Sequence, residues 1–191
     1  STSVEEAREK LALGMDVMIR CGYIRNDLKT IAPFFLQDVD TNGLMLVSDG
    51  FSPKMLVLNG YLNYVARLGV SYGIDPVEVV KMLTIRVARH FQLNRRGGIT
   101  PGWLADIIAV EDLRDFSVKT VVSEGHVLLH NGTLEVSFPP ASFPDDFRNS
   151  IVMPEVHEID FYQSAGKTPA KVKVIAIKTE TVTEMEETTL E

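Results

Sequence analysis

The chain has 191 residues, of which 45% are hydrophobic and 24% are charged, a composition typical of a globular protein that buries a substantial core. Its formal net charge of −7 argues against binding nucleic acid by electrostatic attraction. The single cysteine, Cys21, excludes an internal disulfide and a cysteine-based zinc site, and it fits a reducing, cytoplasmic setting. No apolar run reaches the length of a membrane span, so we expect no membrane partner.

Two short strands are predicted in the first half of the chain. One covers residues 15–20 and is closed by Cys21-Gly22. The other lies within residues 44–50, where four consecutive apolar residues followed by Asp49-Gly50 predict a strand buried on both faces. Buried parallel strands belong to α/β folds, in which ligands collect at the carboxyl ends of the strands. Asp49 follows such a strand, so it is either a turn residue or a site residue.

Helices are predicted between and after these strands. Several of the expected helix starts carry a capping side chain, in two cases followed by proline. The expected helices cover residues 5–13 after Ser3, residues 27–35 after Asn26 with a bend near Pro33, a segment from Ser52-Pro53, a segment reaching Gly73, and a segment from Asp75-Pro76 to about residue 91. This order is typical of the wall of a (β/α) barrel, but two strands make only part of such a barrel. We therefore expect residues 1–97 to be its C-terminal part.

The pattern changes after Gly98. Short strands are predicted at 105–110, 120–122, 126–129 and 134–136, with hairpin turns at Glu124-Gly125 and Asn131-Gly132. Residues 139–170 predict a long loop, and residues 171–177 alternate as in a further strand. We therefore expect a small β-sandwich portion over residues 98–178, followed by a polar, mobile tail over residues 179–191.

Several motifs in this chain resemble those of one superfamily. The segment Gly98-Ile-Thr-Pro-Gly102, followed by Ala105-Asp-Ile107, is similar to a signature of the metal-dependent amidohydrolases, where it leads from a barrel into a β-sandwich. Upstream motifs resemble the microbial adenine deaminases, and they are Glu5–Leu11, Gly14-Met15, Val17–Arg20, Ser48-Asp49, Pro53, Gly60, Asn63-Tyr64, Arg67 and Gly73–Pro76. The resemblance extends to about Thr183 and weakens after residue 135.

The resemblance implies hydrolytic deamination of adenine to hypoxanthine and ammonia. It implies a divalent metal, Mn, Fe or Zn, that lowers the pKa of a bound water. Asp49 would be both metal ligand and catalytic proton carrier, since a carboxylate serves both purposes. The histidine ligands of the family would lie before residue 1, so we expect the isolated chain to be an inactive fragment. Its partners would be a small purine base and, through exposed strand edges, further copies of itself.

Arg20, at a strand end, has two interpretations. It could face the site and bind substrate, or it could be an ion-paired strand end. None of the histidines falls in a ligand position of the family, and they are His90, His126, His130 and His157.

Three departures from the family pattern keep other functions open. Gly50 stands where the family usually has a second acidic residue, Tyr61 where it often has histidine, and Cys21 where it has glutamate. Each departure removes a polar partner of the substrate or of the metal shell. The alternatives are an amidohydrolase acting on another cyclic amide or amine, and a non-catalytic paralogue or assembly module.

Overall fold

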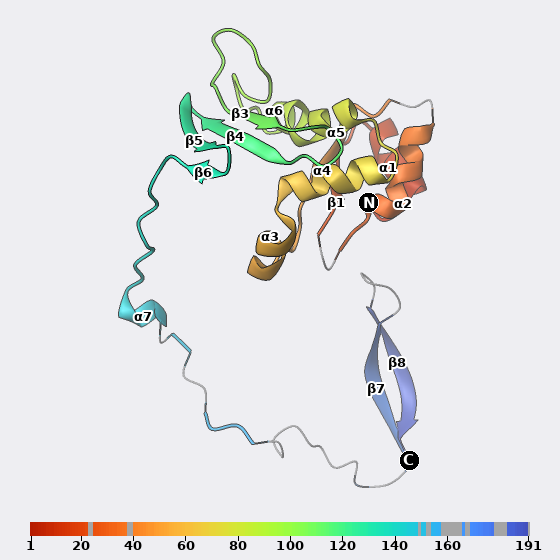
Figure 1. The fold of residues 1–191 in the computed structure, drawn as a ribbon. Helices are drawn as coiled ribbons and strands as arrows, with labels where there is room; N and C mark the ends of the chain where they lie inside the picture. Colours follow the sequence, from red (N-terminus) through yellow and green to blue (C-terminus); the bar gives the residue numbers. More distant parts are fainter. Residues whose placement is uncertain are drawn as a thin grey trace. The chain divides into compact units, whose positions relative to one another are not determined.

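The fold is described from a computed structural model covering residues 1–22, 25–37, 40–148, 150–151, 154–157, 166, 169–177 and 183–190 (Figure 1). The chain divides into two compact units, Ser1–Val136 and Ser137–Glu191. The first unit includes residues on both sides of the boundary predicted at residues 97/98, so the predicted domain limits stay predictions. No helix among the described residues is long and apolar enough to span a membrane.

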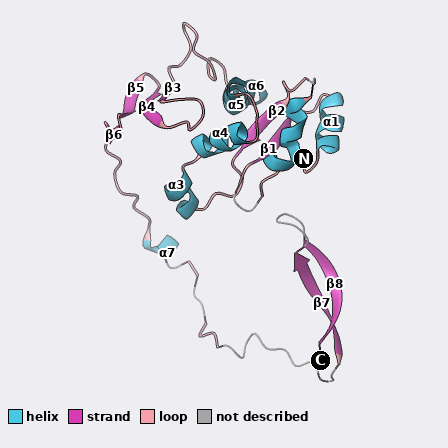
Figure 2. Ribbon diagram, turned by 45° about the vertical axis from the view of Figure 1, so that its right-hand side comes forward, coloured by secondary structure: helices cyan, strands magenta, loops and turns pink. Residues whose placement is uncertain are grey.

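The first unit is organised around two parallel strands, β1 (Val17–Arg20) and β2 (Leu44–Val47), shown side by side in Figure 2. Val17 pairs with Leu44 and Arg20 with Val47, so both strands end at the same edge. Residues 44 to 46 are at most 2% exposed. The predicted short strand, buried on both faces, is confirmed. The described residues show an α/β arrangement, and they show this pair of strands rather than a closed barrel.

The helices begin largely where the capping residues predict. Ser3 Oγ accepts a hydrogen bond from the Glu6 amide at 3.1 Å, and Asp75 Oδ1 accepts one from the Val77 amide at 2.9 Å. The helical segments are α1 (Val4–Ala12), α2 (Leu28–Ile31), the 3₁₀ helix η1 (Ala32–Leu36), α3 (Pro53–Asn59), α4 (Leu62–Ser71), α5 (Pro76–Leu83) and α6 (Ile85–His90).

Two predicted helices are interrupted. The one bent near Pro33 changes from α2 to η1 at Ala32, as expected for a proline that cannot donate its amide. The one expected from Pro76 to residue 91 breaks at Thr84, which separates α5 from α6. Thr84 Oγ1 donates to the Val80 carbonyl at 2.6 Å, and this kind of side-chain bond competes with the helical ladder and bends it.

The core of the first unit lies between the strand pair and the helices. Its buried members are Ala7, Val17, Ile19, Cys21, Leu28, Ile31, Phe34, Leu44, Leu46, Val65, Ala66, Ile74, Val79, Met82 and Phe116. Gly69 on α4 allows close packing with α5, because a Cβ at this position would lie 3.0 Å from Val79 Cγ2. By contrast, α3 has no buried residue.

An antiparallel sheet follows, with strands β3 (Ile107–Val110), β4 (Val118–Ser123), β5 (His126–His130) and β6 (Thr133–Leu134) in that order. The predicted hairpin turns are confirmed. Both central residues of each turn have positive φ, 50° and 85° at Glu124-Gly125 and 47° and 81° at Asn131-Gly132. This single sheet is the β-structure that the first unit has after Gly98, and a sandwich consists of two packed sheets, so the β-sandwich stays a prediction.

The second unit contains a short helix α7 (Asp145–Arg148) and a hairpin of β7 (Ala170–Ile177) and β8 (Thr183–Leu190). Residues 183–190, expected in a polar, mobile tail, form strand β8, whereas residues 178–182 and 191 lie outside the described residues. The tail pairs because the hairpin places Lys173 opposite Glu187 and Ile175 opposite Met185. Much of the predicted loop at 139–170 also lies outside the described residues.

Candidate functional site

The candidate site lies where β1 and β2 end. Asp49 stands two residues after β2, and its side chain is 44% exposed. Asp49 and Gly50 both have positive φ, 41° and 70°, so the chain turns sharply here. A Cβ at Gly50 would meet no atom within 4 Å. The loop therefore presents a carboxylate at the carboxyl edge of the strand pair, with open space beside it.

The loops after the two strands are packed against each other through their backbones. A Cβ at Gly22 would lie 1.4 Å from the Asp49 carbonyl oxygen and 2.7 Å from that of Ser48. The Cys21 amide also donates to the Val47 carbonyl at 2.8 Å. Any side chain at position 22 would therefore displace Asp49, and the sequence alone gives no signal for this contact.

Arg20, the last residue of β1, lies between two carboxylates. Its Nε donates to Asp27 Oδ2 at 2.6 Å and lies 3.9 Å from Asp49 Oδ2. The side chain of Asp27 is 5% exposed and that of Arg20 is 23% exposed. The structure thus brings Arg20 and Asp49 together and pairs Arg20 with Asp27. Substrate binding by Arg20 and metal binding by Asp49 stay predictions.

Asp27 is a site residue that the sequence does not indicate, because its place after Asn26 predicts only the first residue of a helix. Its carboxylate makes no capping hydrogen bond to α2. Instead, Asn26 Oδ1 accepts a bond from the Leu28 amide at 3.2 Å, which leaves the Asp27 carboxylate to Arg20. The hydrogen bond from Arg20 to Asp27 raises the pKa of the Arg20 guanidinium, so the arginine stays charged. The signal available in the sequence was that Asp27 directly follows Asn26, which can already cap the helix.

An aromatic group lies on the other side of the Asp49 loop. Tyr61 Oη and Ser48 Oγ are 3.0 Å apart and share a hydrogen bond. The Phe51 ring meets Tyr61 edge to face, with centroids 5.7 Å apart, and Tyr64 at 5.9 Å. Tyr61 is 49% exposed, so it combines a contact to the residue before Asp49 with a partly accessible side chain.

Cys21 lies at the same edge but is fully buried, and its Sγ lies 3.6 Å from the Ile19 carbonyl oxygen. Burial raises the pKa of the thiol to about 12. A thiol in this state is a poor nucleophile. Cys21 therefore contributes packing rather than chemistry.

The histidines have other partners or positions. His90 Nδ1 lies 2.6 Å from Asp16 Oδ2, before the start of β1 and thus at the opposite, amino edge of the strand pair. His130 Nδ1 lies 3.1 Å from Thr120 Oγ1 in the antiparallel sheet, and His126 begins the same strand, β5. Among the described residues, no group of three His, Cys, Asp or Glu side chains gathers in a geometry that could hold a metal.

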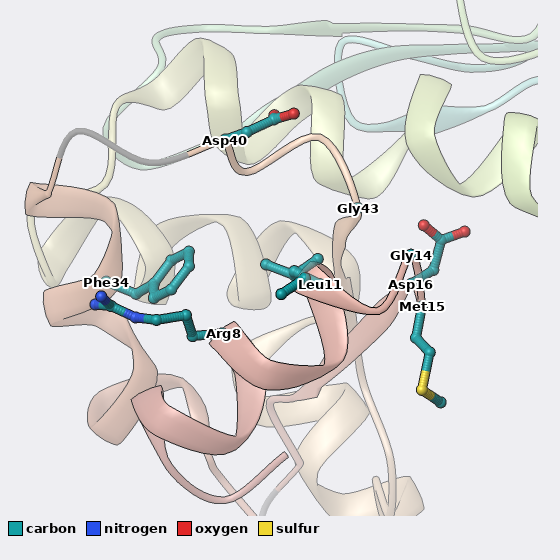
Figure 3. A pocket seen from close by; sticks show the side chains of 9 residues that line it. Arg8, Leu11, Gly14, Met15, Asp16, Phe34, Asp40 and Gly43 are labelled. Carbon is teal, nitrogen blue, oxygen red and sulfur yellow. The ribbon is translucent and has the colours of Figure 1, made fainter.

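A cavity of about 400 Å³ also lies at the amino edge (Figure 3). Figure 3 shows Arg8 and Phe34 at one end of it and Asp16 at the other. The Arg8 guanidinium lies 5.8 Å from the Phe34 ring centroid and donates to Gln37 Oε1 at 2.5 Å. The cavity is thus separated from Asp49 by the length of the strands.

Comparison with known proteins gives a consistent set of matches. Residues 22–128 match the model of the amidohydrolase family. An adenine deaminase of Kosmotoga olearia is 31% identical over 159 residues, which are 83% of this chain and 27% of that protein. Adenine deaminases of Clostridium botulinum strain 657 and Methanosphaera stadtmanae are 33% and 34% identical, over 96% and 95% of this chain and 29% and 32% of theirs.

A solved structure is also similar. The β-aspartyl dipeptidase of Fervidobacterium islandicum matches with a TM-score of 0.57 at 22% identity, covering 70% of this chain and 38% of the dipeptidase. At this identity the match supports the fold alone. The chain spans 27% to 32% of the length of the three deaminases above, so their full length includes much that this chain does not.

Proposed function

The chain belongs to the amidohydrolase family, and from that premise we propose that it is part of an adenine deaminase-like hydrolase to which it contributes the carboxylate of Asp49. The position of Asp49 carries this proposal. It is a partly exposed carboxylate at the carboxyl edge of a buried parallel strand pair, where α/β enzymes bind their ligands. The relatives named adenine deaminase match 83% to 96% of the chain.

We propose that β1 and β2 are two strands of a (β/α) barrel of the TIM type and that the antiparallel sheet belongs to a β-sandwich. The remaining strands would be supplied by the rest of a longer polypeptide. The low coverage of the relatives supports this, as does the amidohydrolase-like fold of the dipeptidase. Unpaired strand edges favour association, and for that reason we also propose a homo-oligomer.

The proposed reaction converts adenine and water to hypoxanthine and ammonia. Amidohydrolases generally use divalent metals, and such an ion, here Mn, Fe or Zn, supplies Lewis acidity when it is bound. Asp49 would hold the ion and carry a proton from the attacking water to the leaving amino group. Arg20 would orient the purine through its guanidinium donors.

Asp49 fits one place in such a metal site. Its carboxylate is a hard oxygen donor, and the ion pair it forms among the described residues, with Arg20 Nε, is long at 3.9 Å. Because the described residues gather no set of three ligands, the other ligands would come from elsewhere in the longer polypeptide. The isolated chain would then have no turnover.

We further propose that the protein works in the cytoplasm on a free purine base. The buried thiol of Cys21 and the lack of a second cysteine fit a reducing compartment. The net charge of −7 fits a small uncharged substrate better than a nucleic acid.

A second function has support in three positions. At Gly50 there is open space instead of a carboxylate, Cys21 is buried and uncharged, and Tyr61 is bonded to Ser48. This set favours either a different cyclic amine or amide as substrate, or a non-catalytic paralogue that serves in assembly. Each change removes a charge or a hydrogen-bonding partner from the edge where the purine would bind.

The experiment uses the longer polypeptide, purified with Mn²⁺, Fe²⁺ or Zn²⁺ and offered adenine beside a panel of cyclic amines and amides. Ammonia release from adenine is the expected result. Release from another compound alone would replace adenine with that substrate. A protein that neither binds metal nor releases ammonia would be the non-catalytic paralogue. Ammonia release by the purified 191-residue chain would refute the need for outside ligands.

A further inference from the structure

We propose that Asp27 is a positioning residue, which holds the Arg20 guanidinium at the carboxyl edge and prevents it from forming a close ion pair with Asp49. The inference rests on the proposed function, in which Asp49 binds a metal and Arg20 binds the substrate. It adds a residue that no motif of the sequence indicated. Three features of the structure support it.

The first feature is a competition between two carboxylates for one cation. Arg20 Nε is 2.6 Å from Asp27 Oδ2 but 3.9 Å from Asp49 Oδ2. An arginine in a short ion pair with Asp49 would occupy the oxygens that a metal needs. The buried carboxylate therefore takes the cation, and the exposed one stays available.

The second feature is the loop that carries Asp27 back to Arg20. The Asp27 amide donates to the Arg20 carbonyl at 2.9 Å, and the Gly22 amide donates to the Arg25 carbonyl at 2.9 Å. Residues 20 and 27 are thus fixed to each other through backbone as well as side chain. Because Asn26 binds the Leu28 amide, the Asp27 carboxylate is not needed at the start of α2.

The third feature is the pair of Nη amino groups of the Arg20 guanidinium. Nε of Arg20 is bonded to Asp27, and no hydrogen bond from either Nη atom to another described residue is found. With Nε fixed, these planar donors have a defined direction instead of the many rotamers of a free arginine. They suit a ligand with hydrogen-bond acceptors in one plane, such as the ring nitrogens or carbonyl oxygens of a heterocycle.

A purely structural role for Asp27 makes a different prediction. If Asp27 only stabilised the loop, its loss would weaken the site whether or not Arg20 is present. If it restrains Arg20, removing the arginine as well removes the competitor for Asp49. The double variant Arg20→Gln/Asp27→Asn therefore separates the two roles.

The test titrates Mn²⁺ into the longer polypeptide and its Asp27→Asn and Arg20→Gln/Asp27→Asn variants, with circular dichroism to check folding. We expect Asp27→Asn to weaken Mn²⁺ binding by about 10- to 100-fold, as loss of partners around metal ligands typically does. The double variant should bind Mn²⁺ about as tightly as the wild type. The KM of the double variant for substrate should nevertheless be higher than that of the wild type, because the variant lacks the Arg20 guanidinium that binds the ligand.

Unchanged Mn²⁺ affinity in Asp27→Asn would overturn the proposal, and so would a loss that the double variant does not restore. If Asp27→Asn fails to fold, the double variant decides alone, since a more than tenfold loss in it contradicts the competition. The metal titration needs no turnover. If the Mn²⁺ pattern is as expected but adenine releases no ammonia, the proposed function fails and the role of Asp27 stands.

Discussion

The two edges of the strand pair differ in how their charges are matched. At the amino edge, Asp16 pairs with His90 at 2.6 Å, and the buried Arg86 donates to Glu78 at 2.5 Å and to the Leu44 carbonyl at 3.5 Å. At the carboxyl edge, Asp49 is 44% exposed, and the ion pair it forms with Arg20 is long. The amino edge holds the Figure 3 cavity, yet Asp16 and Arg86 there already have close charged partners. Unmatched charge marks the candidate site better than cavity volume does.

Substitution of Asp49 should lower kcat, whereas substitution of Asp16 should not. In the longer polypeptide, Asp49→Asn should lower kcat for ammonia release by about 10²- to 10⁴-fold, the usual contribution of a positioned acid–base group. Asp16→Asn is the matched control at the amino edge. It should leave kcat unchanged and cost at most about 1 kcal/mol of unfolding free energy, because its pair is surface-exposed. Equal kcat losses would remove the distinction between the edges.

The buried thiol at the carboxyl edge should make stability depend on alkaline pH. The pKa of Cys21 is raised to about 12 in the folded state, against about 9 when exposed. Its contribution is therefore complete below pH 9 and is lost as the pH rises toward 12, by up to about 4 kcal/mol. Urea unfolding of the wild type and Cys21→Ala between pH 8 and 11 should show a steeper decline in the wild type. Parallel curves would contradict this expectation.

Gly22 at the carboxyl edge and Gly43 at the amino edge should also differ in how much an alanine substitution destabilises the protein. Gly22→Ala would place a methyl group on the Asp49 carbonyl and should cost about 1–3 kcal/mol or more, with a matching loss of activity. Gly43→Ala at the amino edge would meet Leu11 Cδ2 at 2.7 Å and Asp16 Oδ1 at 3.1 Å, which are ends of side chains rather than backbone atoms. We expect it to cost less than about 1 kcal/mol. Thermal unfolding of both variants measures the difference, and a larger cost at Gly43 would contradict it.

The smallest expected effect concerns the surface ion pair between Glu6 and Lys10, which serves as a reference for the effects predicted at the two edges. The hydrogen bond from Lys10 lowers the pKa of Glu6 to about 2. A lowered carboxyl pKa stabilises the folded state above pH 4.5, and this contribution is lost as the pH falls toward 2. Glu6→Gln should flatten the acid decline only slightly, because solvent screens the pair. A decline that flattens strongly in Glu6→Gln would contradict this.

Local signals predicted much of the first unit. The strand at residues 44–47, the capping by Ser3 and Asp75, and the two hairpin turns depend on neighbours in the sequence, so their side chains alone indicate them. Asp49 could be placed after a strand in the same way, but the local pattern left it as either a turn or a site residue, and the resemblance to the adenine deaminases made it the site candidate.

The features that the sequence did not predict depend on contacts that form only in the folded protein. The short bond between Arg20 and Asp27 exists because the Asp27 amide is hydrogen-bonded back to the Arg20 carbonyl, and Gly22 is required only because the Asp49 backbone packs on it. Strand β8 was missed for a similar reason, since pairing with β7 satisfies a polar segment that shows no apolar pattern of its own. The break at Thr84 depends on a single side-chain hydrogen bond.

The backbone contact between Gly22 and Asp49 has a consequence for protein engineering. Loops at the carboxyl ends of strands in α/β enzymes are the usual segments to exchange when an enzyme is given a new substrate. Here the segments after β1 and β2 cannot be transplanted one at a time, since a donor loop without glycine at position 22 would push the recipient's carboxylate out of place. They should be moved together as a single cassette.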